Sequence, residues 1–478
     1  MINFNDLKEI IPLIIIAASA LISLLIAVYS KKSGMPVYVF SLLAVLAALI
    51  FTGLNVTKDV IIISEMLRIN PYSNAFCMIA LLSVFITFMA SKDYLEKLGI
   101  NFGEYYSILL FALFGMMTMI YANDMLTVFI GLETMSICFY VLTGLLRKRM
   151  KSNESAMKYF LLGAFMTGFL LYGMSLIYGA TGYTNITKIL ATYTAIRTPM
   201  FLIGLALFMI GFFFKIGIFP FQMWIPDVYE GAPTVVSGMM STAGKVAAVG
   251  TLIPVLITLN LVEYKMLFSI LATLTMLYGN IVALSQSNLK RLLAYSSIAS
   301  AGYIMVGITS MSDLSIKGIA FYLLAYVFMQ LGAFIVVSVF ENSTPDGKDF
   351  RNVTFDEYKG LAKRSPVLAI ALTVFLLSLA GIPPFAGFWG KYYIFYAAIK
   401  SDLIWLSVIA ILLSVISVYY YLKVIVYMWF KEPEGETSGE AVPVKALSYA
   451  AIMVSLAGTL LFGLYPDLFF TFFKFLIK

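Results

Sequence analysis

The chain has 478 residues, of which 61% are apolar and only 12% are charged. Soluble globular proteins carry about 25% charged residues, so the composition excludes a soluble protein and predicts a polytopic membrane protein. There is no histidine, and the two cysteines, Cys77 and Cys138, lie in apolar stretches. These counts exclude a disulfide framework and argue against haem or thiolate metal sites. Proton chemistry must therefore use Lys, Glu, Asp, Tyr and water.

Fourteen apolar stretches are long enough to cross a bilayer as helices. They lie near residues 9–29, 37–56, 71–90, 105–121, 124–145, 156–179, 199–219, 234–259, 266–285, 291–310, 317–340, 366–398, 403–430 and 446–466. The even number places both termini on one side of the membrane. We expect an all-α membrane protein with about 14 transmembrane helices and a short amphipathic, interfacial tail after Pro466.

Lysine and arginine are divided unequally between the loops on the two sides. The loops after odd-numbered helices hold 17 of the 32 such residues, whereas the other side, termini included, holds 10. Positively charged loops stay in the cytoplasm. We therefore expect both termini to face outward and the longest loop, 341–365, to be cytoplasmic. The net charge of +7 then reflects topology and gives no reason to expect nucleic-acid binding.

Two short motifs recur at nearly constant spacing. Gly217-Ile-Phe-Pro-Phe221 returns 164 residues later as Gly381-Ile-Pro-Pro-Phe385, and Tyr159-Phe-Leu-Leu162 returns more weakly at an offset of 162 as Phe321-Tyr-Leu-Leu324. The spacing predicts two five-helix units, which would be inverted repeats because five is odd. Each unit carries a Gly/Pro break, in helices 7 and 12. The expected divisions are 1–104 (helices 1–3), 105–260 (first repeat), 261–430 (second, inverted repeat) and 431–478 (helix 14 and tail).

Six ionisable residues lie within apolar spans, where an ionised side chain costs roughly 2.5 to 3.5 kcal/mol on insertion scales. They are Glu133, Lys158, Lys215, Lys245, Lys391 and Lys423. Glu133 lies near the midplane, either as a functional carboxylate or in a structural salt bridge between helices. Lys215 stands just before Pro220, whose missing N–H opens the helix, so it either contacts water or extends to the interface.

Lys245 lies mid-span among small residues, which permit close approach of water or of other helices, and Lys391 closely follows the second break. Lys158 and Lys423 are nearer to helix ends, where interfacial placement explains them equally well. The set does not converge on one pocket and indicates a lateral line of proton-transfer stations linked by water. We hypothesise a switch in which Glu133 keeps its paired lysine protonated, and opening of the pair releases the proton to Lys245.

Several motifs connect this pattern with a known family. They are Phe214-Lys-Ile-Gly-Ile-Phe-Pro-Phe-Gln-Met-Trp-Ile-Pro-Asp-Val-Tyr-Glu-Gly-Ala-Pro233, Leu132-Glu133, Ala294-Tyr-Ser-Ser297 and Gly381-Ile-Pro-Pro-Phe-Ala-Gly-Phe-Trp-Gly-Lys391. Over essentially its whole length the chain resembles the antiporter-like subunits of the proton-pumping NADH:quinone oxidoreductase, respiratory complex I. Within that family its motifs resemble those of the N subunits more than those of the M subunits.

The resemblance implies that Glu133 and Lys215 form a coupling ion pair, that Lys245 is the central proton carrier, and that protons leave from Lys391 toward the outer side. Lys158 is a weaker candidate. The sequence has no soluble dinucleotide-binding fold and no Cys or His set for an iron–sulfur cluster, so we expect no cofactor or metal in this chain. NADH, FMN, iron–sulfur clusters and quinone are expected in partner subunits of a complex I-like assembly in a bacterial cell (inner) membrane. The family often has histidine where this chain has Gln222 and Ser300, so a proton path that requires imidazole there is excluded.

Two alternative functions remain open. One is a subunit of a multi-subunit cation/proton antiporter, and the other is a subunit of a related membrane-bound oxidoreductase with a different electron donor. Only Glu133 is acidic in mid-span, whereas a sodium site usually requires several hard oxygen ligands. Proton translocation driven by electron transfer in other subunits is therefore preferred. A purely structural scaffold would leave the buried lysines unexplained.

Overall fold

The computed structural model describes residues 8–30, 33–192, 198–259, 262–343, 349–351, 353–432 and 443–472. Within them, 13 helices are long and apolar enough to cross a membrane, and Pro366–Ala380 is a shorter apolar helix. The shorter helix continues past a break into Ala386–Lys400, and the two occupy the twelfth expected segment. The prediction of an all-α polytopic membrane protein is confirmed. Six cations of the charge count lie outside the described residues, namely Lys31, Lys32, Arg197, Lys348, Lys474 and Lys478.

The helices follow one another along the chain with short connections. The first group is α2 (Ile11–Tyr29), α3 (Gly34–Leu54), α4 (Pro71–Leu98), α5 (Gly103–Tyr121), α6 (Met125–Thr143), α7 (Met150–Thr181), α8 (Ile186–Thr192), α9 (Pro199–Ile216) and α10 (Trp224–Gly231). The central group is α11 (Thr234–Met239), η1 (Met240–Gly244), α12 (Lys245–Thr258), η2 (Val262–Tyr264), α13 (Lys265–Leu284), α14 (Leu289–Ser310), α15 (Asp313–Tyr326), η3 (Val327–Leu331) and α16 (Gly332–Phe340). The last group is η4 (Phe355–Tyr358), α17 (Leu361–Arg364), α18 (Pro366–Ala380), α19 (Ala386–Lys400), α20 (Ile404–Phe430), α21 (Ala446–Leu464) and α22 (Asp467–Phe472).

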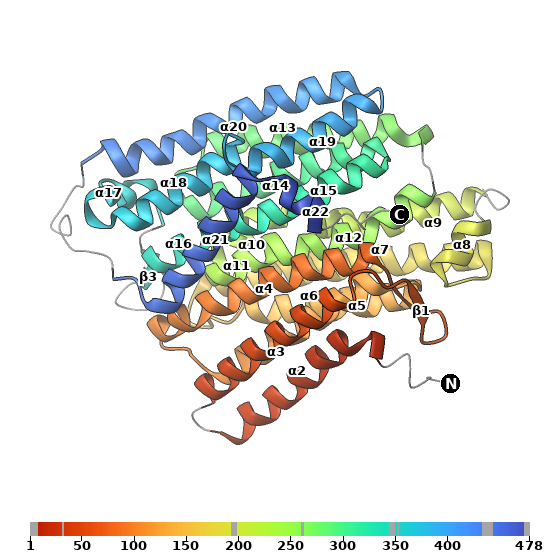
Figure 1. Ribbon diagram of the computed structural model, residues 1–478, viewed down its shortest axis with the longest axis horizontal. Helices are drawn as coiled ribbons and strands as arrows, with labels where there is room; N and C mark the ends of the chain where they lie inside the picture. Colours follow the sequence, from red (N-terminus) through yellow and green to blue (C-terminus); the bar gives the residue numbers. More distant parts are fainter. Residues whose placement is uncertain are drawn as a thin grey trace.

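Two small antiparallel hairpins mark the two ends of the bundle. Strands β1 (Val60–Ile62) and β2 (Leu67–Ile69) lie at the same end as α8, whereas β3 (Asn342–Ser343) and β4 (Phe350–Arg351) lie at the end of α17 (Figure 1). Ion pairs join loops at each end, such as Lys188 with Glu65 at 2.7 Å near β1. Lys445 pairs with Glu96 at 3.0 Å at the other end. The loops that the charge count assigned to one side of the membrane therefore gather at one end of the structure.

The centre of the bundle is formed by α14 and the two spans that contain π-helical turns. Every residue of α14 except Arg291 is buried. The outer helices α2 and α20 instead expose large apolar side chains, such as Leu21 and Leu412. Apolar surface of this kind faces lipid or neighbouring membrane subunits. A charged side chain in the centre, in contrast, must find a partner inside the protein.

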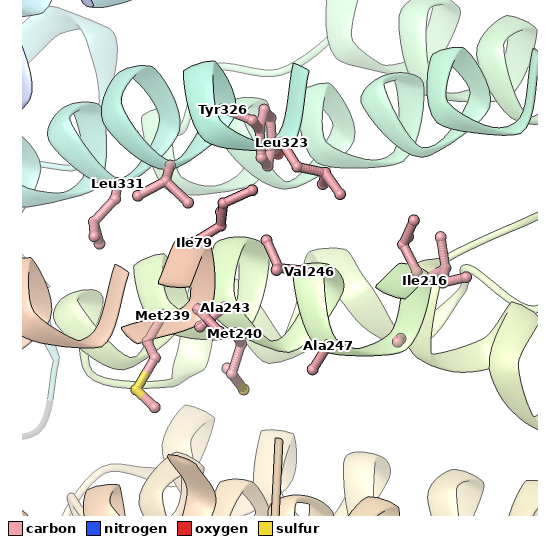
Figure 2. Packing of buried hydrophobic residues seen from close by; sticks show 14 of the residues in the cluster. Ile79, Ile216, Met239, Met240, Ala243, Val246, Ala247, Leu323, Tyr326 and Leu331 are labelled. Carbon is pink, nitrogen blue, oxygen red and sulfur yellow. The ribbon is translucent and has the colours of Figure 1, made fainter. Parts of the chain in front are cut away.

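The π-helical turns lie beside each other in this centre. Turn η1 comes directly before Lys245, and η3 comes directly after Tyr326. Figure 2 shows Tyr326 directed toward the span that carries Val246. A π turn inserts an extra residue into an α-helix and redirects the side chains around it, and such turns are frequent at functional sites. The structure thus marks the surroundings of Lys245 independently of its charge.

The seventh and twelfth spans are broken, as the sequence predicted. Helices α9 and α18 each end before a glycine, Gly217 with φ 89° and ψ 40° and Gly381 with φ 86° and ψ 36°. Glycine adopts this left-handed conformation without a Cβ clash. Each break also contains a cis peptide bond, Phe219–Pro220 in one and Pro383–Pro384 in the other. The two breaks share their backbone geometry, while the division of the chain into repeats at 105, 261 and 431 stays a prediction.

Helices α7 and α9 cross at a point that has no side chains. A Cβ atom at Gly173 would lie 2.5 Å from the carbonyl oxygen of Gly204 and 2.6 Å from the backbone nitrogen of Phe208. Small residues allow transmembrane helices to approach this closely. The crossing therefore fixes α9, the helix that carries Lys215.

We expect Gly173→Ala to lower the thermal stability of the purified protein in detergent. The added methyl group forces two backbones apart, and overpacking of this kind costs about 1–3 kcal/mol. The matched control is Gly168→Ala on the same helix, because a Cβ atom at Gly168 has no neighbour within 4 Å. Scanning fluorimetry measures both midpoints, and equal midpoints for the two variants would contradict the role of the crossing.

Candidate functional site

Lys215 lies on the last turn of α9 inside a cluster of aromatic rings. Its side chain is only 8% exposed, so it does not extend to a membrane surface. The Nζ atom donates to the hydroxyl of Tyr140 at 3.5 Å and lies 5.1 Å from the ring centre of Tyr159, a cation–π contact. The indole of Trp224 donates to the carbonyl oxygen of Phe214 at 2.9 Å. A carbonyl group that the break leaves without a helical partner is thus bonded by a side chain, because water is not available inside a membrane.

Glu133 lies half-buried on α6 and faces α7. Its Oε1 atom accepts a hydrogen bond from the hydroxyl of Thr167 at 2.7 Å. Among the described residues it forms no ion pair with Lys215, so the expected direct contact between these two groups is absent from this structure. The reason is that Tyr140 lies beside Lys215, in space that the missing side chain of Gly163 leaves open.

Lys245 begins α12 immediately after η1 and is 1% exposed. Its Nζ atom donates to both the carbonyl oxygen and the hydroxyl of Ser297 on α14, at 2.6 Å and 2.7 Å. It also lies 5.3 Å from the ring centre of Tyr326. An ammonium group has three donors, so Ser297 accounts for two of them and the third can serve water or the ring.

Lys391 lies on α19 just beyond the second break. Its Nζ atom donates to the carbonyl oxygen of Ala380 at 2.9 Å, at the end of α18 where the helix dipole favours a cation. The amine also lies 4.9 Å from the ring centre of Tyr303. Lys391 borders a cavity of about 400 Å³, which Phe388 and Tyr392 also line. The residue thus combines a bonded amine with access to open space.

Helix α14 connects the environments of Lys245 and Lys391. Ser297 and Tyr303 are six residues apart on it, about 9 Å along the helix axis. Ser300 lies between them on the same helix and is buried. Three buried hydroxyl-bearing residues of one helix, Ser297, Ser300 and Tyr303, therefore lie between the environments of the two lysines.

Gln222 lies in the first break and is completely buried. Both of its side-chain amide atoms have no partner among the described residues. Leaving a buried polar group unpaired costs about 1–3 kcal/mol, and a bound water molecule is the usual remedy. Gln222 therefore indicates a hydrated position in the break that contains Lys215.

Lys158 belongs to an ionic cluster at the β3 end and not to the buried line. Its side chain is 43% exposed and pairs with Glu154 at 2.7 Å and with Asp227 at 2.8 Å. Asp227 also pairs with Arg291 at 2.9 Å. Lys423 is half-buried, 5.4 Å from the ring centre of Phe355. The structure thus separates these two lysines from the three that are enclosed.

Sequence reasoning missed the groups that hold the lysines. Tyr140 follows Glu133 by two helical turns, so helical periodicity placed it on the same face. Ser297 was quoted only as part of a motif, and Tyr303 was not singled out. A buried pair, Lys290 with Glu341, was also missed. Both residues lie at the ends of spans, where the pattern of apolar residues does not predict how deeply a side chain is buried.

Comparison with known proteins agrees with this geometry. The family described as NADH:quinone oxidoreductase/Mrp antiporter, TM, matches residues 122–417. The NADH-quinone oxidoreductase subunit N of Trichlorobacter lovleyi is 44% identical over 474 residues, which cover 97% of this chain and 95% of that protein. A chain of respiratory complex I from Thermus thermophilus has a TM-score of 0.82 at 31% identity and covers 96% of this chain and 98% of its own. A chain of the Mrp complex from Dietzia sp. has a TM-score of 0.84 at 19% identity, covering 98% and 97%, and shows the fold alone.

The family match extends over more than half of the chain, and the relative from Trichlorobacter lovleyi is matched over nearly its whole length. The resemblance inferred from the motifs around Lys215 and Lys391 is thereby confirmed. The chain belongs to the NADH:quinone oxidoreductase/Mrp antiporter family and is similar within it to subunit N.

Proposed function

We propose that this chain is a membrane-arm subunit of a proton-translocating NADH:quinone oxidoreductase and moves protons through its buried lysines. The observation that carries the proposal is the enclosure of Lys215, Lys245 and Lys391, each at most 8% exposed and each bonded to a hydroxyl or carbonyl group at a helix break or π turn. The identity to a relative named subunit N supports the choice of assembly. The antiporter alternative has support from the fold alone.

In this proposal, proton movement depends on the balance between the neutral and the protonated form of each buried amine. Desolvation favours a neutral amine, whereas a nearby carboxylate or carbonyl favours the ammonium form. A change near Glu133 shifts this balance at Lys215, which passes a proton by way of water at Gln222 toward Lys245. The hydroxyl groups on α14 then lead to Lys391. No step requires imidazole, which this chain lacks.

The direction of transport rests on the division of charge between the loops. We place the end that contains residues 341–365 in the cytoplasm and both termini outside, in a bacterial cell membrane, because positively charged loops remain inside. Protons then enter from the loop end and leave from Lys391 toward the outer side.

The driving force comes from neighbouring subunits. The face of α6 and α7 beside Glu133 exposes apolar side chains such as Ile130, Ile137 and Phe165. A neighbouring membrane-arm subunit fits this face, and its charges could act on Glu133. NADH, FMN, iron–sulfur clusters and quinone belong to partner subunits in this proposal, together with the chemistry that they supply.

We expect Lys245→Ala to abolish proton pumping in membrane vesicles while the complex still assembles. Loss of a group that transfers protons lowers rates by about 100-fold or more. Lys245→Arg should also impair pumping, since guanidinium scarcely releases its proton. Lys423→Ala is the matched control, because that lysine also lies in a span but is half-exposed. Full pumping by Lys245→Ala, measured by quenching of a pH-sensitive dye, would refute the assignment.

We expect Glu133→Gln to reduce pumping strongly and Glu133→Asp to reduce it less, because only aspartate retains a charge that can act on Lys215. Both side chains can still accept a hydrogen bond from Thr167. Glu154→Gln on the neighbouring helix serves as a control for the loss of one partly exposed carboxylate. Equal pumping by wild type, Gln and Asp variants would make Glu133 a structural residue.

A further inference from the structure

The buried pair of Lys290 and Glu341 lies at the β3 end, apart from the three enclosed lysines of the proposed path. Glu341 follows α16 and is completely buried, and Lys290 at the start of α14 is 1% exposed. The Nζ atom of Lys290 lies 4.0 Å from Oε2 of Glu341. The hydroxyl of Thr234 donates to Oε2, and that of Tyr94 donates to Oε1 at 3.3 Å. Four elements, α4, α11, α14 and the end of α16, thus meet around one carboxyl group.

The pair has access to the surface through Lys290. Its Nζ atom donates to the carbonyl oxygen of Ala232 at 2.9 Å, and Lys290 is one of the residues that line a cavity of about 30 Å³. Lys151 and Asp349 line the same cavity, form an ion pair at 3.5 Å and are more than half-exposed. A cavity of this size has room for one or two water molecules. Water from the loop end can therefore reach the amine that neighbours Glu341.

On its inner side the carboxyl group touches the span that carries Lys245. Thr234 is the first residue of that span, and Ser237 and Ser241 follow at successive turns before Lys245. Neighbours one turn apart on a helix are about 5–6 Å apart, a gap that one water molecule bridges. The two serine hydroxyls donate to backbone carbonyls at 2.8 Å, so their oxygen atoms remain acceptors for water. This row of hydroxyls leads from Glu341 to the central lysine.

The surroundings of Glu341 hold further charged groups. Lys97 donates to the carbonyl oxygen of Val339 at 2.8 Å, and Arg149 stacks over Phe350 at 3.3 Å. Several cations therefore surround the carboxyl group, and they stabilise its negative charge in the deprotonated form. Its protonated form is neutral and suits the buried position. Both states are compatible with the site, as a proton carrier requires.

We propose that Glu341 is the proton-loading residue through which protons from the loop end reach Lys245, with Lys290 as its counter-charge. A proton taken from water in the surface cavity binds the carboxylate, passes along the hydroxyl row and binds the neutral amine of Lys245. The carboxylate that remains pairs again with Lys290. One proton enters and one is delivered in each cycle, and no electron is involved. The inference rests on the proposed function.

The test uses the assembled complex in inside-out membrane vesicles, where the buffer bathes the loading side. Glu341→Gln retains an oxygen for the Thr234 hydroxyl but cannot carry a proton. We expect pumping to fall by about tenfold or more at a buffer pH of about 8 and by less at about 6, because unassisted loading depends on proton concentration. The matched control is Glu432→Gln, an exposed carboxylate at the same end that pairs with Lys363 at 3.4 Å.

The outcomes separate this inference from the proposed function. Pumping by Lys245→Ala in the same assay would overturn the proposed function. Loss of pumping in that variant, with wild-type pumping by Glu341→Gln at every pH, would overturn only the loading role. An equal loss of pumping by Glu341→Gln at every pH would make Glu341 a structural residue and would also overturn the loading role. If Glu341→Gln fails to assemble, Glu341→Asp replaces it, because it keeps a carboxyl group that can carry a proton. Pumping with the wild-type pH profile in that variant supports the loading role, and an equal loss of pumping at pH of about 6 and about 8 would refute it.

Discussion

A bilayer offers no hydrogen-bond partners, so every amine and every carbonyl group freed by a broken helix must be satisfied inside the protein. This chain meets both needs together. The amine of Lys391 binds the carbonyl oxygen of Ala380 at the second break, and the amine of Lys245 binds that of Ser297. At the first break an indole, that of Trp224, takes this role. Irregular backbone and buried charge therefore stabilise each other, which explains why the costly lysines occur where the helices are irregular.

The polar groups between the lysines are hydroxyls and one amide. Hydroxyls both donate and accept hydrogen bonds and remain neutral, so they can orient water without adding charges that the membrane would penalise. Gln222 and Ser300 occupy the positions at which the family resemblance led us to expect histidine. In the proposed path the ionisable groups are therefore lysine and carboxylate, and the other positions are assigned to water. Such a path depends on hydration more than a path that contains imidazole would.

The fold was largely accessible from the sequence, because span length and hydropathy are imposed by the thickness of the bilayer. The breaks at Gly217 and Gly381 were accessible for the same kind of reason, since glycine and proline alter backbone geometry locally. The π turns were not, because they have no residue signature and arise from packing between spans. The resemblance implied that Glu133 and Lys215 form an ion pair, whereas in the structure Tyr140 contacts Lys215 and Thr167 contacts Glu133. The sequence also does not predict how deeply a residue at the end of a span is buried, and Glu341 was therefore assigned to a loop.

The rigid position of α14 has a mechanical consequence. Ser297 and Tyr303 stand on one uninterrupted helix that is enclosed on nearly all sides. A sliding or tilting motion of that helix would disturb the contacts of Lys245 and Lys391 at once, and its tight enclosure resists such travel. In the proposed mechanism, gating between these two lysines would then come from movement of their long side chains and from changes in the hydration of the space between them. Helix α14 would then stay in place while only side chains and water molecules move beside it.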